Sequence, residues 1–168
     1  MMSVEEKPST PVTRYLDEKG IPYRFFRHSG IVHSLEQAAQ ERGQHPEQII
    51  RSIVFRLSRG GFVMVLVAGE RQVSWQALRH HLGTSRISMA TKVEVLEVTG
   101  YHLGAVSPFG TKQALRILID RGALQEEEIS IGSGVRHTTV IMQQKDFLRA
   151  LEPVEIGDFA VEEGHQIN

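Results

Sequence analysis

A glycine-rich segment in the middle of the chain, residues 100–110, combines three glycines with a proline and a serine. Within it, the flexible Gly104 and the rigid Pro108 bracket three residues whose backbone N–H groups can point at one place. Such a set of donors is how proteins hold a carbonyl oxygen, a developing oxyanion or a phosphate. A tight turn between two strands is the simpler interpretation, because Gly and Pro mark most turns. The three candidate donors belong to Ala105, Val106 and Ser107.

A second glycine turn follows later, in Ile131-Gly-Ser-Gly134. Two glycine-rich turns frame a single pocket if the strands that precede them end on the same side of a sheet. On that condition, Gly132, Ser133 and Gly134 become candidate pocket residues beside the segment 104–108.

The other chemistry-bearing side chains do not form a recognisable catalytic or metal-binding pattern. None of the eight histidines stands in a ligand-like spacing with another histidine or a carboxylate, and the chain has no cysteine. Ser107 lies in Val-Ser-Pro rather than in the Gly-x-Ser-x-Gly pattern of a nucleophilic serine. There is no phosphate-binding Gly-Lys-[Ser/Thr] motif and no dinucleotide fingerprint. We therefore expect neither a metal nor a cofactor.

The elements that must position these turns are short helices and strands in mixed order. Thr10-Pro11, Ser34 and Ser74 are typical helix starts, and Gly20, Gly43 and Gly83 typical helix ends. Residues 62–68 are apolar at every position, which predicts a central strand. The pattern predicts an α+β domain with a mixed, largely antiparallel sheet. We expect helices near 10–19, 34–42, 73–82, 88–98 and 144–151, and strands near 21–26, 47–57, 62–68, 114–119, 127–131 and 138–142.

Length and composition indicate one domain of ordinary size over residues 1–168, with a core at about 12–152 and weakly ordered tails. No stretch approaches the roughly 18 apolar residues of a membrane span, and the N-terminus lacks a signal-peptide core, so we expect a cytoplasmic protein with no membrane partner. Residues 45–92 carry seven Lys/Arg against two Glu, whereas residues 120–168 carry four against ten Asp/Glu. The basic middle suits a polyanionic partner, although a solvated surface is the simpler explanation.

Taken together, these residues resemble the YbaK/ProX-type aminoacyl-tRNA editing domains, which also occur inserted in bacterial prolyl-tRNA synthetases. The resemblance rests on Gly100-Tyr-x-x-Gly104-x-Val-Ser-Pro-Phe-Gly110, which contains the family's Gly-x-x-x-Pro element. The segments around residues 23–28, 34–39, 48–55, 131–136 and 145–148 are similar to the family's in the same order. The similarity covers about residues 12–152.

The resemblance implies a compact α+β fold with a barrel-like sheet and short flanking helices. It implies a metal-free enzyme that hydrolyses the ester between a wrong amino acid and the 3′ end of tRNA. Backbone donors of the segment 104–108 would hold the substrate carbonyl, and a ribose hydroxyl of the tRNA would place the water. His28 and the turn at Gly132, Ser133 and Gly134 would line the pocket. The implied partners are mischarged tRNA and, in addition, an aminoacyl-tRNA synthetase.

Position 51 departs from the family pattern, because Arg51 stands where the family carries a lysine on its first long strand. Arginine keeps the charge, but it is bulkier and does not lose its proton. Arg51 is therefore either the residue that holds the tRNA end or the substrate carbonyl, or a surface residue of the strand. The departure leaves two other functions open: a module that binds the tRNA end or a synthetase without hydrolysis, and an esterase for other small aminoacyl esters.

Overall fold

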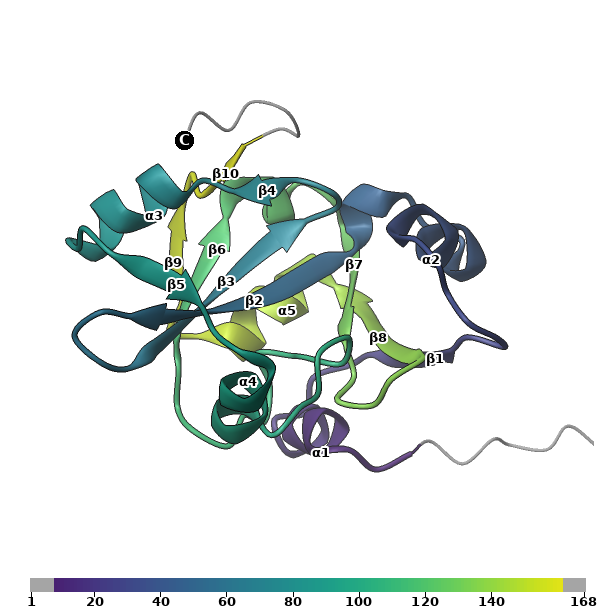
Figure 1. The fold of residues 1–168 in the computed structure, drawn as a ribbon. Coiled ribbons are helices and arrows are strands. Elements are labelled where there is room, and N and C mark those ends of the chain that lie inside the picture. The colour runs from purple at the N-terminus through teal and green to yellow at the C-terminus, as the bar shows by residue number, and fades with distance from the viewer. Residues whose placement is uncertain (1–7, 162–168) are drawn as a thin grey trace, which may run out of the picture.

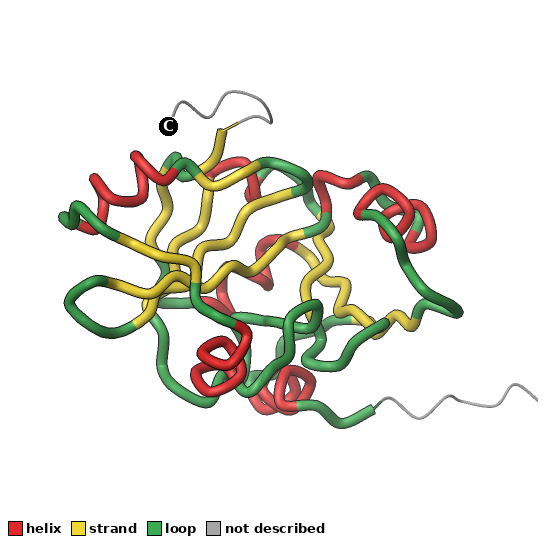
Figure 2. The backbone as a smooth tube through the Cα atoms, in the orientation of Figure 1, coloured by secondary structure: helices red, strands yellow, loops and turns green. Residues whose placement is uncertain are grey.

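The computed structural model describes residues 8–161, so parts of the two tails predicted to be weakly ordered, residues 1–7 and 162–168, lie outside it. Five α-helices and ten strands are defined in this part of the chain (Figures 1 and 2). The helices are α1 (Pro11–Glu18), α2 (Leu35–Arg42), α3 (Trp75–Leu82), α4 (Lys92–Thr99) and α5 (Gln144–Leu151). The strands are β1 (Arg24–Arg27), β2 (Ile50–Leu57), β3 (Phe62–Ala68), β4 (Gln72–Val73), β5 (Ile87–Met89), β6 (Arg116–Asp120), β7 (Glu128–Gly132), β8 (Thr138–Gln143), β9 (Glu155–Gly157) and β10 (Ala160–Val161).

The helix boundaries follow from the capping residues. The Thr10 side chain accepts a hydrogen bond from the backbone N–H of Thr13, and Pro11 occupies the first turn of α1. Ser34 and Ser74 cap α2 and α3 in the same way. Gly43 and Gly83 end these two helices in the left-handed conformation that glycine adopts most easily.

The strands form three sheets. The largest has the order β5-β2-β3-β6-β9, in which β3–β6 and β6–β9 are parallel and the other pairs antiparallel. The antiparallel sheet β1-β8-β7 lies beside it, and β10 pairs with β4. The predicted α+β class with a mixed, largely antiparallel arrangement is confirmed. The strands do not close into a barrel, because the two larger sheets share only an isolated bridge between Ile49 and Ser130.

The large sheet is covered on both faces, which explains the uniformly apolar sequence of β3. On one face, Met64 and Leu66 of β3 pack with residues of α1, α5, β7 and β8 in the main core. On the other face, Val63 and Val65 pack with residues of α3, β4 and β6. All four side chains are fully buried, so the prediction of a central strand from residues 62–68 is confirmed.

Two strands follow α5 where the sequence pattern indicates little structure. β9 pairs in parallel with β6, and β10 lies against β4. The buried Asp120 carboxylate fixes the connection between them, since it accepts hydrogen bonds from the backbone N–H groups of Phe159 at 2.8 Å and Ala160 at 3.0 Å. These contacts span about forty residues of sequence, so no local pattern predicts them.

Candidate active site

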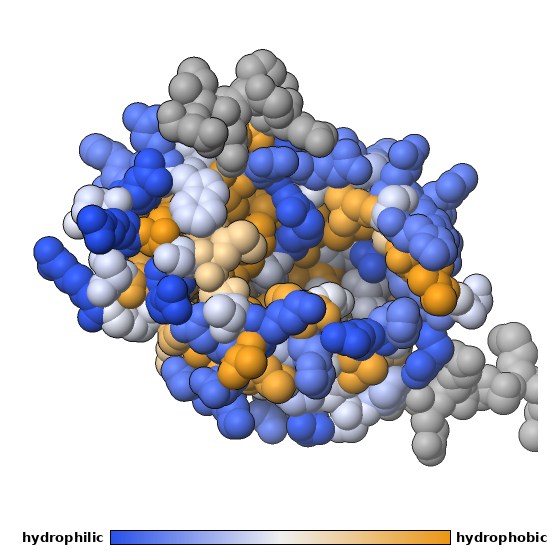
Figure 3. All heavy atoms as spheres, in the orientation of Figure 1, coloured by the Kyte–Doolittle hydropathy of each residue, from blue (hydrophilic) through white to orange (hydrophobic). Residues whose placement is uncertain are grey.

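A cavity of about 380 Å³ opens where the two larger sheets meet, between β2, α2 and the loop at residues 103–106. Figure 3 shows the face of the molecule that is hollowed in this region. β2 pairs with β5 only at residues 55–57, so its edge at residues 51–53 faces the cavity instead of another strand. The lining combines apolar side chains such as Ile50 and Ile131 with two arginines, Arg42 and Arg51.

The loop 104–108 contributes Gly104 and Val106 to the lining. Gly104 has a φ of +91°, a conformation that disfavours other residues. The N–H of Ala105 donates to the carbonyl of His102 at 3.0 Å, so this predicted donor is used within the loop. The N–H groups of Val106 and Ser107 have no hydrogen-bond partner in residues 8–161. Since backbone donors in folded proteins are nearly always paired, these two suit a ligand acceptor.

The side chain of Ser107 and the ring of Pro108 belong to the structure of the loop itself. The fully buried Ser107 accepts a hydrogen bond at Oγ from the N–H of Phe109 at 3.2 Å. This short-range bond shapes the turn, and Pro108 lies buried inside it. Ser107 therefore acts through its side chain on the loop conformation.

The two glycine turns are in direct contact. The N–H of Gly134 donates to the carbonyl of Ala105 at 3.1 Å. Gly132, at the end of β7, lines the cavity, and a Cβ at this position would lie 2.2 Å from the carbonyl oxygen of Val106. Only glycine therefore allows the loop to approach β7 so closely. The structure brings together the segments 104–108 and 132–134, which are far apart in the sequence.

Ser133 holds the turn at residues 132–134 in place through its hydrogen bonds. Its side-chain hydroxyl bonds with the hydroxyl of Thr138 and the carbonyl of Val135, and the residue is fully buried. Its backbone carbonyl accepts a hydrogen bond at 2.7 Å from the hydroxyl of Thr10, the residue that caps α1. Ser133 is not among the residues that line the cavity.

Tyr101 fills the space between the two turns. Its hydroxyl lies 2.5 Å from the carbonyl oxygen of Phe109 and 3.1 Å from that of Gly110, which fixes the far end of the loop. A Cβ on Gly134 would lie 2.9 Å from the Tyr101 ring. Burial raises the pKa of Tyr101 to about 12, because the phenolate is poorly solvated there.

Arg51 lies on β2 and points toward the turn between β3 and β4. Its Nε donates to the carbonyl of Gly69 at 2.6 Å, and its Nη2 donates to the carbonyl of Arg71. Burial lowers the pKa of Arg51, and the negative charge of Glu70 opposes that shift. Arg51 thus belongs to the cavity lining, while two of its guanidinium nitrogens tie β2 to the turn between β3 and β4.

His28 lies behind the cavity and not on its surface. The ring is almost fully buried, and its Nε2 is 3.1 Å from Nε of Arg42. Because a guanidinium only donates, Nε2 must accept, and the ring proton sits on Nδ1, which faces Glu41 at 3.3 Å. His28 therefore orients Arg42, the side chain that does line the cavity.

Comparison with known proteins assigns the family. The sequence profile described as "Aminoacyl-tRNA editing domain" matches residues 30–150, which include the cavity and both glycine turns. The chain belongs to this family. The resemblance drawn from the sequence is confirmed.

Relatives of this editing domain include free-standing and inserted forms. The multifunctional Ser/Thr-tRNA deacylase ProXp-y of Escherichia coli K12 is 28% identical over 142 residues, which cover 82% of this chain and 84% of that protein. A proline–tRNA ligase of Thermosipho melanesiensis is 30% identical over 122 residues, or 71% of this chain, but the match spans only 21% of the ligase. A crystal structure described as a candidate trans-editing enzyme for prolyl-tRNA synthetase superposes with a TM-score of 0.82 at 24% identity, covering 92% of this chain and 99% of that one.

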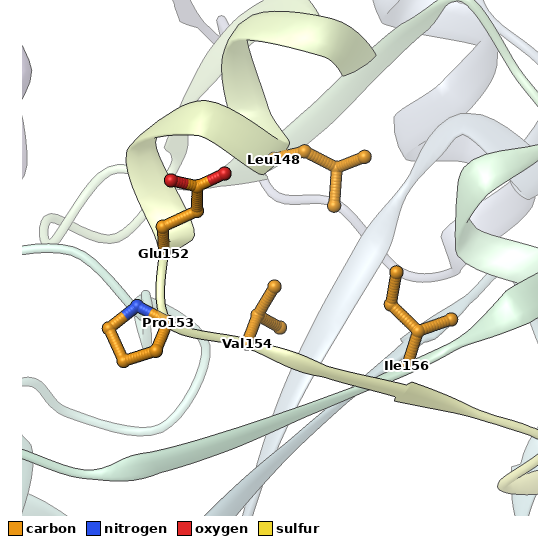
Figure 4. A pocket seen from close by; sticks show the side chains of 5 residues that line it. All are labelled: Leu148, Glu152, Pro153, Val154 and Ile156. Atoms are coloured by element: carbon orange, nitrogen blue, oxygen red, sulfur yellow. The ribbon is translucent and has the colours of Figure 1, made fainter.

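The editing domain has a second hollow, shown in Figure 4, at the junction of α5 and β9. Leu148, Val154 and Ile156 face the same space there, and Glu152 and Pro153 complete the lining. This hollow contains no candidate carbonyl-binding donor pair and no predicted site residue. The candidate site is therefore the cavity between the sheets.

In residues 8–161, no three His, Asp or Glu side chains gather in a way that could hold a metal ion. No helix in the same range is long and apolar enough to cross a membrane.

Arg42 is the charged cavity residue that the sequence interpretation missed. It follows the buried Ala38 and Ala39 by four and three positions, so it lies on the buried face of α2. An arginine three and four positions after two small apolar residues of a helix is the sequence signal that could have identified Arg42.

Proposed function

We propose that this editing domain is a trans-acting aminoacyl-tRNA deacylase that hydrolyses the ester of mischarged tRNA. The observation that carries the proposal is the pair of unpartnered N–H groups of Val106 and Ser107, in a loop that borders the cavity. Two such donors suit the oxygen of a carbonyl that becomes an oxyanion during attack by water. The family membership and the free-standing deacylase relative support the same function.

In this reaction, water attacks the carbonyl carbon of the aminoacyl ester, and the bond to the ribose oxygen breaks. The ribose oxygen takes up one proton of the water and becomes a free hydroxyl of the tRNA, the second proton is released to solvent, and the amino acid leaves as a carboxylate. The N–H groups of Val106 and Ser107 hold the oxyanion, and Gly104 leaves room for the substrate. A ribose hydroxyl of the tRNA places the water, so no side-chain nucleophile is required. Arg51 supplies positive charge at the edge of β2.

A second function, binding of the tRNA end or a synthetase without hydrolysis, is favoured by one observation. Two donor atoms of Arg51 are already bound to the carbonyls of Gly69 and Arg71. If the reaction needs a mobile cation at this position, the Arg51 guanidinium cannot supply it, because these two bonds hold it in place.

The test is deacylation of a panel of mischarged tRNAs, including Ala-, Ser-, Thr- and Cys-tRNAs, by the wild type and Arg51→Lys. Arg59→Lys, on the exposed turn between β2 and β3, is the matched control. The proposal predicts that the wild type hydrolyses at least one member well above the spontaneous rate. A silent wild type that binds the tRNA end, with activity gained in Arg51→Lys, would instead establish the binding module. A wild type that neither hydrolyses nor binds would remove tRNA as the substrate.

A further inference from the structure

Arg42 lies in the cavity with hydrogen bonds to neutral side chains only. Arg56, Arg71 and Arg116 each pair with a carboxylate. Arg42 has no carboxylate within ion-pairing distance in residues 8–161, although it is partly buried and lines the cavity. Its two hydrogen bonds go to neutral groups, His28 Nε2 at 3.1 Å and Ser130 Oγ at 2.9 Å. A partly buried cation with no paired carboxylate is favoured when a ligand supplies the opposite charge.

The guanidinium is also held in a fixed orientation. Its two neutral partners lie on different elements, since His28 follows β1 and Ser130 belongs to β7. His28 is itself anchored, because its backbone N–H donates to the carbonyl of His137 at 2.8 Å and its ring contacts Glu41. The remaining N–H groups of Arg42 make no hydrogen bond in the described part of the chain. A preorganised planar fork with free donors matches an oxyanion that offers two oxygens.

The surroundings support a role in binding a ligand. Burial lowers the pKa of Arg42 to about 10, with Glu41 acting in the opposite direction, so the protein accepts an energetic cost to keep this cation in the cavity. The other α2 side chain in the lining is the apolar Leu35. A solvated salt bridge, the usual reason for an arginine at a helix C-terminus, is therefore not its role here.

We propose that Arg42 binds an oxyanion of the substrate in this cavity. The inference rests on the proposed deacylase function, which supplies two sources of that chemistry. One is the phosphate that precedes the terminal adenosine of tRNA, and the other is a carboxylate on the side chain of the esterified amino acid. Arg42 is thus a binding residue separate from the carbonyl-binding loop.

The first arm of the test measures binding of 5′-AMP and adenosine by calorimetry to the wild type, Arg42→Gln, Arg42→Lys and the control Arg59→Gln. If the oxyanion is the phosphate, AMP binds to the wild type at least about tenfold more tightly than adenosine, as expected for a charge-assisted hydrogen bond. Arg42→Gln abolishes this preference without changing adenosine binding, Arg42→Lys restores part of it, and Arg59→Gln leaves it intact.

The second arm compares hydrolysis of Asp- and Glu-tRNAs with Asn- and Gln-tRNAs. If the oxyanion is the side-chain carboxylate, AMP and adenosine bind equally, and the wild type prefers the acidic substrates by about tenfold or more, a preference lost in Arg42→Gln. The inference is overturned if the wild type shows neither preference. It is also overturned if Arg42→Gln keeps the preference that the wild type shows. Hydrolysis of neutral aminoacyl-tRNAs without either preference would overturn the inference and leave the deacylase function standing. A preference for AMP over adenosine in a protein that hydrolyses no tRNA would support the role of Arg42 and overturn the deacylase function.

Discussion

Replacement of Gly132 by alanine tests whether the loop position controls the chemistry. The added Cβ would lie 2.2 Å from the carbonyl oxygen of Val106, 2.9 Å from its carbonyl carbon and 3.0 Å from the carbonyl oxygen of Ala105. All three atoms belong to the backbone, so no side chain can rotate away. An ordinary carbon–oxygen contact needs roughly 1 Å more than the shortest of these distances, so the loop must move by about that amount.

The displacement has two measurable consequences. Overpacking of this kind destabilises a domain by about 1–3 kcal/mol. A shift of about 1 Å in groups that position a reacting substrate lowers its rate by about a hundredfold. We therefore expect Gly132→Ala to fold, to unfold at lower denaturant concentration, and to deacylate the best substrate about a hundredfold more slowly.

The assay is single-turnover hydrolysis of labelled aminoacyl-tRNA, combined with equilibrium unfolding in urea. Gly30→Ala is the matched control, because no atom lies within 4 Å of a Cβ at that position and its φ is not in the left-handed range. Wild-type stability together with a wild-type rate in Gly132→Ala would refute the reasoning. Lost stability with an unchanged rate would show that the loop position does not matter for catalysis.

Two further predictions concern the same loop. Gly104→Val should lower deacylation strongly while the domain stays folded, because a Cβ meets no atom within 4 Å but the φ of +91° strains any other residue by about 1–2 kcal/mol. Kinetics and circular dichroism of Gly104→Val and Gly104→Ala check this, and full activity in the valine variant would exclude the loop from the mechanism. Tyr101→Phe should destabilise the domain by about 1–3 kcal/mol at neutral pH, because the carbonyl of Phe109 loses its buried donor. The folded-state pKa is raised from 10.0 to about 12, so this wild-type advantage should be complete below pH 10 and decline as the pH rises toward 12; a pH-independent difference in urea unfolding between the two proteins would contradict the assignment.

The sequence predicts the local features of the site well, because they depend on neighbouring residues. The helix caps at Thr10, Ser34 and Ser74 and the two glycine turns each follow from a few adjacent positions. The reason for one glycine is nevertheless different from the expected one. Gly104 supplies a positive φ, whereas Gly132 lies outside the left-handed range and is needed for the space beside Val106.

The features that the sequence did not predict depend on contacts between distant segments. Arg42 has the position of an ordinary C-terminal helix cation, and its orientation depends on its bonds to His28 and to Ser130, which is 88 residues away. The same arrangement places His28 behind Arg42, so it does not line the cavity. The N–H of Ala105 is taken by His102 because the loop folds into a turn that the Gly-x-x-x-Pro spacing alone does not specify.

The hydroxyl of Thr10 performs two tasks with one atom, since it accepts the N–H of Thr13 inside α1 and donates to the carbonyl of Ser133 in the glycine turn. Fraying of the first helical turn that carries the Thr10 hydroxyl away therefore also releases the carbonyl of Ser133 in the turn at 132–134. A ligand that binds only the closed form of the cavity must then also suppress opening at the start of α1, by a free energy that grows with the ratio of ligand concentration to Kd. The first helix is thus thermodynamically part of the binding site, although none of its residues lines the cavity.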